Sequence, residues 1–251
     1  MIGAGECHVW WARPHHGLDA WRRCLTASER ARAPGYAPRA RQRFVTGRVV
    51  ARSVLGASLG LPPRRVPLDA TCRRCEVAHG KPRLAVAVPP LQLSIAHAGD
   101  RVVVAVSRGV AVGVDVERVA NTPADPGLMA DVLAASERLA VAWQSEPQRP
   151  WAVARLWTRK EAVLKIDGRG VVAEAMSTVV VSPPAQPARL VAGETDPPLP
   201  RPVGLCDLDP GGPYVASLAV GGRTAPAVRQ RWWASPSDQA TAAPTHPTPS
   251  R

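Results

Sequence analysis

A short internal repeat limits the folds that this chain can adopt more than any other feature. Leu25-Thr-Ala-Ser-Glu-Arg30 matches Leu133-Ala-Ala-Ser-Glu-Arg138 at five of six positions, at an offset of 108 residues, and the same offset places Arg52 on Lys160. Chance is the alternative explanation in a chain rich in Ala and Arg. A duplication predicts an α+β fold of two similar halves related by a pseudo-twofold axis, with the active site in the cleft between them.

Length and composition agree with two halves of ordinary domain size. The chain has 251 residues, of which 45% are hydrophobic. We expect an N-terminal half at 1–109, a C-terminal half with the metal site at 110–222, and a Pro/Thr/Ser/Ala-rich tail at 223–251 that is disordered. No run reaches the roughly 18 apolar residues of a membrane span. The first residues lack a signal-peptide pattern, so a cytoplasmic protein without a membrane partner is expected.

Hydrophobic periodicity and turn residues predict the main elements. We expect helices at 19–25, 39–59, 126–141 and 150–166, and strands at 9–12, 83–88, 91–96, 177–181 and 213–220. A hairpin is predicted from strands at 101–107 and 110–117, which turn at Arg108-Gly109.

Carboxylates gather at the end of the strand predicted at 110–117. Period-two alternation puts Asp115 and Glu117 on the face opposite Val114 and Val116. On the helix at 150–166, Glu161 lies four residues from a lysine, so the two share a face. If that helix packs beside the strand end, all three carboxylates meet.

Such a cluster predicts a site for magnesium and phosphate. Mg²⁺ is typically held by one or two carboxylates together with phosphate oxygens, which makes Asp115, Glu117 and Glu161 the candidate ligands. Glu161 can also act as a base, and Lys165 can neutralise or protonate a leaving group.

Lysine is rare in this basic chain. The 32 Lys and Arg residues include only three lysines, Lys81, Lys160 and Lys165. Lysine is a compact charge that can give up a proton, whereas a guanidinium stays protonated. We therefore expect the three lysines to mark positions where arginine cannot serve.

The formal net charge of +12 indicates an acidic partner. A basic nucleic-acid-binding protein is one alternative, although clustered carboxylates repel nucleic acid, and another magnesium enzyme acting on nucleotides is a second. The five cysteines do not form a secreted disulfide framework. Cys72, Cys75 and His79 have part of a zinc-ligand spacing, but no second Cys/His pair lies nearby, so a loop with free thiols is the favoured interpretation.

These residues resemble a known enzyme family. Gly113-Val-Asp-Val-Glu117 and Trp157-Thr-Arg-Lys-Glu-Ala-Val-Leu-Lys165 are similar to the two signature motifs of the 4′-phosphopantetheinyl transferases, in particular the monomeric surfactin-synthetase type. Further matches are His79-Gly-Lys-Pro82, the segment from Leu93 to Gly99, and Arg43 with Arg52. The resemblance implies transfer of phosphopantetheine from coenzyme A to a serine of an apo acyl or peptidyl carrier protein, with release of 3′,5′-ADP.

The resemblance also implies individual roles. Asp115, Glu117 and Glu161 would bind magnesium with the pyrophosphate of coenzyme A, Glu161 would activate the carrier serine, and Lys165 would contact the pyrophosphate. Binding of the adenine and 3′-phosphate would fall to Arg43, Gly80, Lys81, Pro82 and His97, with Arg30 and Arg32 as looser candidates. The chain departs from the family around His97, where Ala96 and Ala98 replace residues that often carry hydroxyls.

Overall fold

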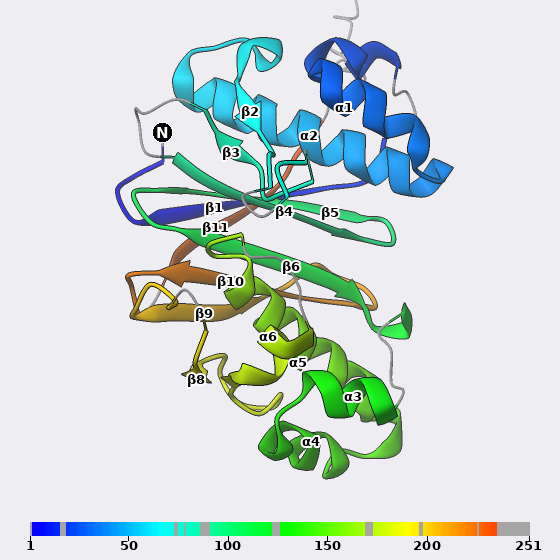
Figure 1. The fold of residues 1–251 in the computed structure, drawn as a ribbon, viewed down its shortest axis with the longest axis vertical. Helices are drawn as coiled ribbons and strands as arrows, with labels where there is room; N and C mark the ends of the chain where they lie inside the picture. Colours follow the sequence, from blue (N-terminus) through cyan, green and yellow to red (C-terminus); the bar gives the residue numbers. More distant parts are fainter. Residues whose placement is uncertain are drawn as a thin grey trace, which may run out of the picture.

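The computed structural model describes residues 2–15, 19–72, 75–77, 79–85, 91–121, 126–168, 173–195, 198–224 and 226–234. These residues form an α+β fold of stacked layers, in the order helix, sheet, sheet, helix (Figure 1). The α+β class predicted from the sequence is confirmed. Within the described residues, no helix combines the length and apolar character needed to cross a bilayer.

The first sheet takes its strands from both ends of the chain, in the order β11-β1-β5-β4. The strands are β1 (Glu6–Ala12), β4 (Leu91–Ala98), β5 (Arg101–Arg108) and β11 (Ala227–Trp232). β5 pairs antiparallel with β1 and β4, and β11 runs parallel to β1. Both faces of β5 are buried, because Val102 and Val104 belong to one apolar cluster and Val103 and Ala105 to another.

The second sheet is antiparallel, in the order β6-β10-β9. It consists of β6 (Val112–Arg118), β9 (Val203–Leu208) and β10 (Tyr214–Gly221). Val114 and Val116 of β6 join the apolar cluster shared with the first sheet. Alternation along β6 therefore turns Asp115 and Glu117 to the outer face of the second sheet.

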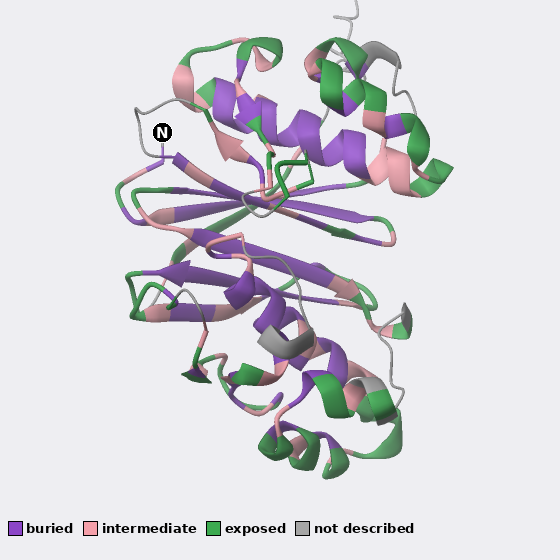
Figure 2. Cartoon of the chain, viewed as in Figure 1, coloured by how far each residue is buried: buried purple, intermediate pink, exposed green. Residues whose placement is uncertain are grey.

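One long helix covers the outer face of each sheet (Figures 1 and 2). α2 (Pro38–Leu59) packs on the first sheet, and α5 (Arg149–Leu164) packs on the second. α2 begins with a proline in its first turn and ends at Gly60, whose φ of 67° is the left-handed conformation that stops helices. The sequence predicts both helices closely.

Smaller elements surround these layers. They are α1 (Ala27–Arg32), α3 (Pro126–Val132), α4 (Ala135–Ala142), α6 (Ala173–Thr178), and the short pairs of β2 (Leu68–Asp69) with β3 (Arg83–Leu84) and β7 (Val179–Val181) with β8 (Leu190–Gly193).

The hairpin predicted from 101–107 and 110–117 does not form. β5 pairs with β1 and β4, whereas β6 pairs with β10 in the other sheet. The chain passes between the sheets at Gly109, whose φ is 78°. β5 is Val-rich and buried on both faces, so its sequence does not show whether the strand that follows is a hairpin partner or part of a second, stacked sheet.

Three other predicted elements differ in type or extent. Residues Asp19–Cys24 form a 3₁₀ helix, and residues 177–178 end α6 instead of starting a strand. The helix predicted at 126–141 is divided into α3 and α4, because the Glu137 carboxylate accepts a hydrogen bond from Ala134 N at 2.8 Å and so caps a new helix. The predicted strand at 83–88 lies outside the described residues beyond residue 85.

The disorder expected for 223–251 is wrong for Ala227–Trp232, which form β11. Trp233 N donates to Trp11 O at 2.7 Å, and Trp11 Nε1 donates to Gln230 Oε1 at 3.0 Å.

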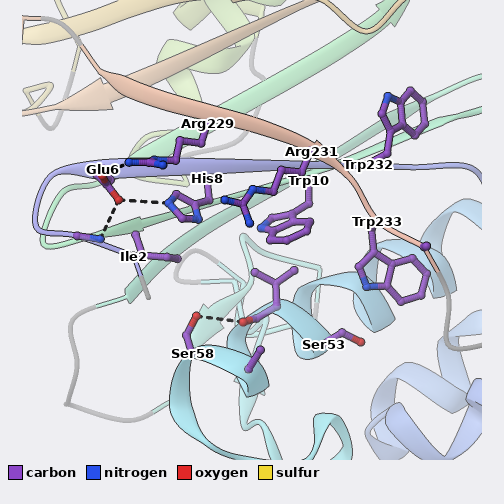
Figure 3. A pocket seen from close by; sticks show the side chains of 14 residues that line it. Ile2, Glu6, His8, Trp10, Ser53, Ser58, Arg229, Arg231, Trp232 and Trp233 are labelled. Carbon is purple, nitrogen blue, oxygen red and sulfur yellow. Dashed lines mark hydrogen bonds and ion pairs between the residues drawn. The ribbon is translucent and has the colours of Figure 1, made fainter. Parts of the chain in front are cut away.

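Side chains of β1, β11 and α2 line a hollow of about 710 Å³ (Figure 3). Residues 235–251 lie outside the described part of the chain.

The two copies of the repeat make the same contacts. Glu29 of α1 pairs with Arg52 of α2 at 2.9 Å, and Glu137 of α4 pairs with Lys160 of α5 at 2.6 Å. Glu137 lies 108 residues after Glu29, and Lys160 lies 108 residues after Arg52. In addition, Arg30 donates to Leu25 O, as Arg138 does to Leu133 O. Shared contacts favour duplication over chance, and the pseudo-twofold relation and the division at 109/110 stay predictions.

Candidate active site

The site begins at the crossing of β6 and α5. A Cβ on Gly113 would lie 2.0 Å from Ala162 O and 2.9 Å from Ile166 N, so only glycine lets the strand and the helix approach this closely. The contact explains in physical terms why a glycine stands two residues before Asp115. It places the outer face of β6 directly beside the helix face that carries Glu161.

The structure brings together the predicted carboxylates and Lys165. Lys165 Nζ lies 2.5 Å from Asp115 Oδ1 and 3.6 Å from Glu161 Oε2. Asp115 and Glu161 are only 4% and 5% exposed, whereas Glu117 is partly exposed at the strand end. The predicted packing of the helix beside the strand end is therefore confirmed, while the binding of metal by these groups stays a prediction.

The carboxylates hold their protons more tightly than isolated ones. Burial, followed by the charge of Asp115, raises the pKa of Glu117 to about 7. Burial also raises the pKa of Glu161 to about 7, although Lys165 partly offsets the effect, and it raises the pKa of Asp115. For Lys165, burial would lower the pKa, but Asp115 and Glu161 outweigh it and raise the pKa, so Lys165 stays an ammonium. One ammonium does not compensate three carboxylates.

The donor set fits a hard divalent cation. Asp115 Oδ2 and Glu161 Oε2 are buried oxygens without a hydrogen-bond partner. Buried carboxylate oxygens are normally hydrogen-bonded or bound to a metal. The unbonded oxygens and the all-oxygen chemistry match the preferences of Mg²⁺.

A cavity of about 320 Å³ lies next to the carboxylates. Gly80, Lys81, Pro82, His97 and Lys165 all line it, so residues predicted to bind one ligand share one cavity. The cavity is also lined by two aromatic rings, Tyr36 and Phe44, and by two arginines, Arg32 and Arg48. A cavity with rings and cations suits a nucleotide.

Lys81 is fixed inside the protein and does not reach freely into the cavity. Its Nζ donates to Val112 O at 2.6 Å and to Ile166 O at 2.7 Å, so it joins the start of β6 to the end of α5. Burial, followed by repulsion from Arg83, lowers the pKa of Lys81 to about 7. This contact holds the cavity wall against the strand and helix that carry the carboxylates.

Arg43 lies in a neighbouring hollow of about 840 Å³, which Glu117 also lines. Its Nη1 donates weakly to Gly99 O at 3.4 Å. His97 lines both the hollow and the cavity, and so joins Arg43 to the other predicted ligand residues. His97 is exposed on one side, but partial desolvation, followed by the charges of Arg43 and Lys165, lowers its pKa to about 4, so the ring is neutral near pH 7.

The structure separates the arginines of the first half into different roles. Arg52 is 1% exposed and pairs with Glu29, and Arg30 is bonded to the Leu25 carbonyl, so neither faces the cavity. Arg32 does line it, as the looser prediction requires. Sequence reasoning missed Arg48, which lines the cavity and lies one helical turn from Phe44. That spacing is the signal that was available.

The comparisons with known proteins agree with this geometry. Residues 111–204, which include β6 and α5, match the 4′-phosphopantetheinyl transferase superfamily. Over 223 residues the chain is 30% identical to the 4′-phosphopantetheinyl transferase HetI of Nostoc sp. (strain PCC 7120 / SAG 25.82 / UTEX 2576), a match that covers 86% of this chain and 88% of that protein. The chain therefore belongs to the 4′-phosphopantetheinyl transferase superfamily, as its motifs predict, and it is a phosphopantetheinyl transferase.

Proposed function

We propose that this enzyme transfers 4′-phosphopantetheine from coenzyme A to a serine of an apo carrier protein, releases 3′,5′-ADP and requires magnesium. The observation that carries the proposal is the pair of buried, unbonded oxygens of Asp115 and Glu161, beside an ammonium and a nucleotide-sized cavity. Asp115, Glu117 and Glu161 would hold the ion. When bound, it would neutralise charge on the pyrophosphate oxygens.

The two hollows give coenzyme A a direction in the site. We assign the adenine to the cavity with Tyr36 and Phe44, bounded by Gly80, Lys81 and Pro82. The 3′-phosphate would lie near His97, where Arg43 approaches from one side and Arg48 from the other. The neutral His97 ring can donate one hydrogen bond to the phosphate, and phosphate binding would raise its pKa. Lys165 would contact the pyrophosphate.

The residues then have defined tasks in the transfer. The oxygen of the carrier serine forms a bond to the phosphorus that carries the pantetheine arm, and the bond from that phosphorus to the ADP oxygen breaks. The serine proton would pass to the Glu161 carboxylate, which acts as the base. Lys165 remains charged and stabilises the negative charge that develops on the departing phosphate.

We place the enzyme with the surfactin-synthetase type, acting as a cytoplasmic monomer on acyl or peptidyl carriers of polyketide or nonribosomal peptide synthesis. The five cysteines, none in a disulfide, suit a reducing compartment. The +12 charge suits an acidic carrier surface and a polyanionic substrate. Nucleic acid is not part of the proposal, because three carboxylates at the site would repel it.

A panel of apo acyl and peptidyl carrier proteins, incubated with the enzyme and coenzyme A, tests the proposal by intact mass. We expect at least one carrier to gain a phosphopantetheine group with magnesium present and none to gain it with excess chelator. Transfer that continues at full rate in chelator would contradict the magnesium requirement. A melting temperature that DNA raises, but coenzyme A with magnesium does not, would favour the nucleic-acid-binding alternative.

A further inference from the structure

The loop between β2 and β3 gathers three soft metal ligands outside the carboxylate cluster. The ligand atoms of Cys72, Cys75 and His79 all lie within 4.8 Å of one another. Zinc binds sulfur at about 2.3 Å and imidazole nitrogen at about 2.0–2.1 Å, so the donors around one tetrahedral ion lie roughly 3.5–3.8 Å apart. Small side-chain rotations bring all three donors onto one ion.

Backbone hydrogen bonds among the described residues of this loop hold the segments that carry the three donors close together. Cys72 N donates to Val77 O at 2.8 Å, Glu76 N donates to Cys72 O at 2.9 Å, and His79 N donates to Val77 O at 2.8 Å. Among the described non-glycine residues, only Glu76, directly after Cys75, has a positive φ, at 59°. Residues other than glycine rarely adopt this backbone conformation, and such outliers concentrate at functional sites.

The side chains are in a state that can bind metal. Neither Cys72 nor Cys75 is in a disulfide, and Cys75 Sγ lies 2.8 Å from His79 Nε2. Thiolate and imidazole ligands select zinc and similar transition metals, whereas the carboxylate cluster at Asp115 selects magnesium. The two sets of donors would therefore hold different ions.

We infer that Cys72, Cys75 and His79 form a transition-metal site, with zinc as the ion whose ligand preferences match best. Three protein ligands leave the fourth position of a tetrahedral ion to a water or to a ligand atom. Cys72 and His79 also line the 320 Å³ cavity, so this position lies at the rim of the cavity.

The site positions one wall of the cavity. A Cβ on Gly80 would lie 2.9 Å from Cys72 Cα, so the metal loop packs directly against the segment Gly80–Pro82. Lys81 then fixes that segment to Val112 and Ile166 through their carbonyl oxygens. The ion would hold the cavity wall in place without touching the reacting atoms, a role that rests on the proposed function, whereas metal binding itself does not.

Metal content tests the inference directly. Full-length protein is loaded with zinc under reducing conditions, dialysed and analysed by mass spectrometry of the elements, and cobalt is loaded in parallel. We expect about one zinc per chain, a thiolate-to-cobalt charge-transfer band, and at least about a tenfold loss of zinc affinity in Cys75→Ser. Cys24→Ser is the control, because Cys24 lies outside the loop, and it should bind zinc like the parent.

Several results would overturn the inference. They are zinc absent from the dialysed parent, equal zinc binding in Cys75→Ser and the parent, or a Cys72–Cys75 disulfide that persists in reductant. If Cys75→Ser does not fold, removal of zinc from the parent by a chelator replaces it, and a melting temperature that does not fall would overturn the site.

A kinetic comparison separates the metal role from direct contact with coenzyme A. Under the inference, His79→Ala loses zinc and raises the KM for coenzyme A more than it lowers kcat. A raised KM with zinc fully retained would make His79 a substrate ligand and would overturn its assignment to the metal. Zinc stoichiometry does not depend on transferase activity, so failure of the proposed function would leave this test intact.

Discussion

Glu161→Gln should make the metal-free protein more stable and abolish transfer. The substitution keeps the shape of the side chain, and Glu161 is 5% exposed, so packing is unchanged. In the folded protein burial raises its pKa from the ordinary 4.5 to about 7. At about 1.4 kcal/mol for each pKa unit, the ionised form is roughly 3 kcal/mol less favourable in the folded than in the unfolded protein. Glutamine removes that penalty.

The sign of the pH dependence follows from the raised pKa. Glu161 favours the folded protein most at low pH, where the carboxyl is protonated, and this contribution is lost as the pH rises through about 7. Urea unfolding with chelator at several pH values measures it. We expect Glu161→Gln and the parent to be about equally stable near pH 4, below the ordinary pKa of 4.5, and the variant to be more stable by up to roughly 3 kcal/mol near pH 8.

A matched control is available on the same half of the protein. Glu137 is also a buried glutamate, but its oxygens accept hydrogen bonds from Ala134 N and Val181 N and pair with Lys160. Glu137→Gln leaves that ammonium buried without its counter-charge, so it should destabilise the protein by about 3–5 kcal/mol. The reasoning is refuted if Glu161→Gln is destabilising near pH 8, or if the two variants behave alike.

Further predictions concern the helix crossing, the lysine and the last strand. Gly113→Ala should lower kcat at least about 100-fold, because α5 must move, whereas Gly35→Ala, where a Cβ meets nothing within 4 Å, should not. Lys165→Arg should bind coenzyme A normally by calorimetry but turn over at least about tenfold more slowly, because a forked guanidinium cannot replace the compact ammonium. Truncation after Arg223 removes β11 and should lower the free energy of unfolding by at least about 2 kcal/mol, whereas truncation after Ala234 should not.

The candidate site could be predicted from the sequence because its residues sit on strongly periodic elements. Alternation along β6 and four-residue spacing on α5 fixed which faces carry Asp115, Glu117, Glu161 and Lys165. Only the crossing at Gly113 had to be supplied by the fold. In contrast, Arg48 was missed, because its four-residue spacing from Phe44 is a weak signal where arginine is common along α2, and tertiary packing decides which arginine faces the cavity.

The strand pairing was harder to predict because it depends on contacts distant in sequence. β5 and β6 are neighbours along the chain but belong to different sheets, and burial on both sides removes the alternation that would reveal this. β11 has an exposed, Ala- and Arg-containing sequence that resembles a loop, and it becomes a strand by pairing with β1. Composition alone therefore indicated disorder where the first sheet is completed.

The rarity of lysine indicated three sites where a compact ammonium is needed, and the structure shows a different reason at each. Lys160 is fully buried, donates to three backbone carbonyls and pairs with Glu137. Lys81 bridges two carbonyls, and Lys165 faces the carboxylates. Of the three, Lys165 is the one we assign to catalysis.

Calorimetric titration of coenzyme A, with and without magnesium, tests most directly whether the three carboxylates form a magnesium site that the pyrophosphate completes. The parent should bind coenzyme A at least about tenfold more tightly with magnesium than in chelator, a difference of about 1.4 kcal/mol. Glu161→Gln should lose most of that difference while it keeps the magnesium-free affinity. Equal affinity of the parent with and without magnesium, or an undiminished magnesium effect in Glu161→Gln, would contradict the account.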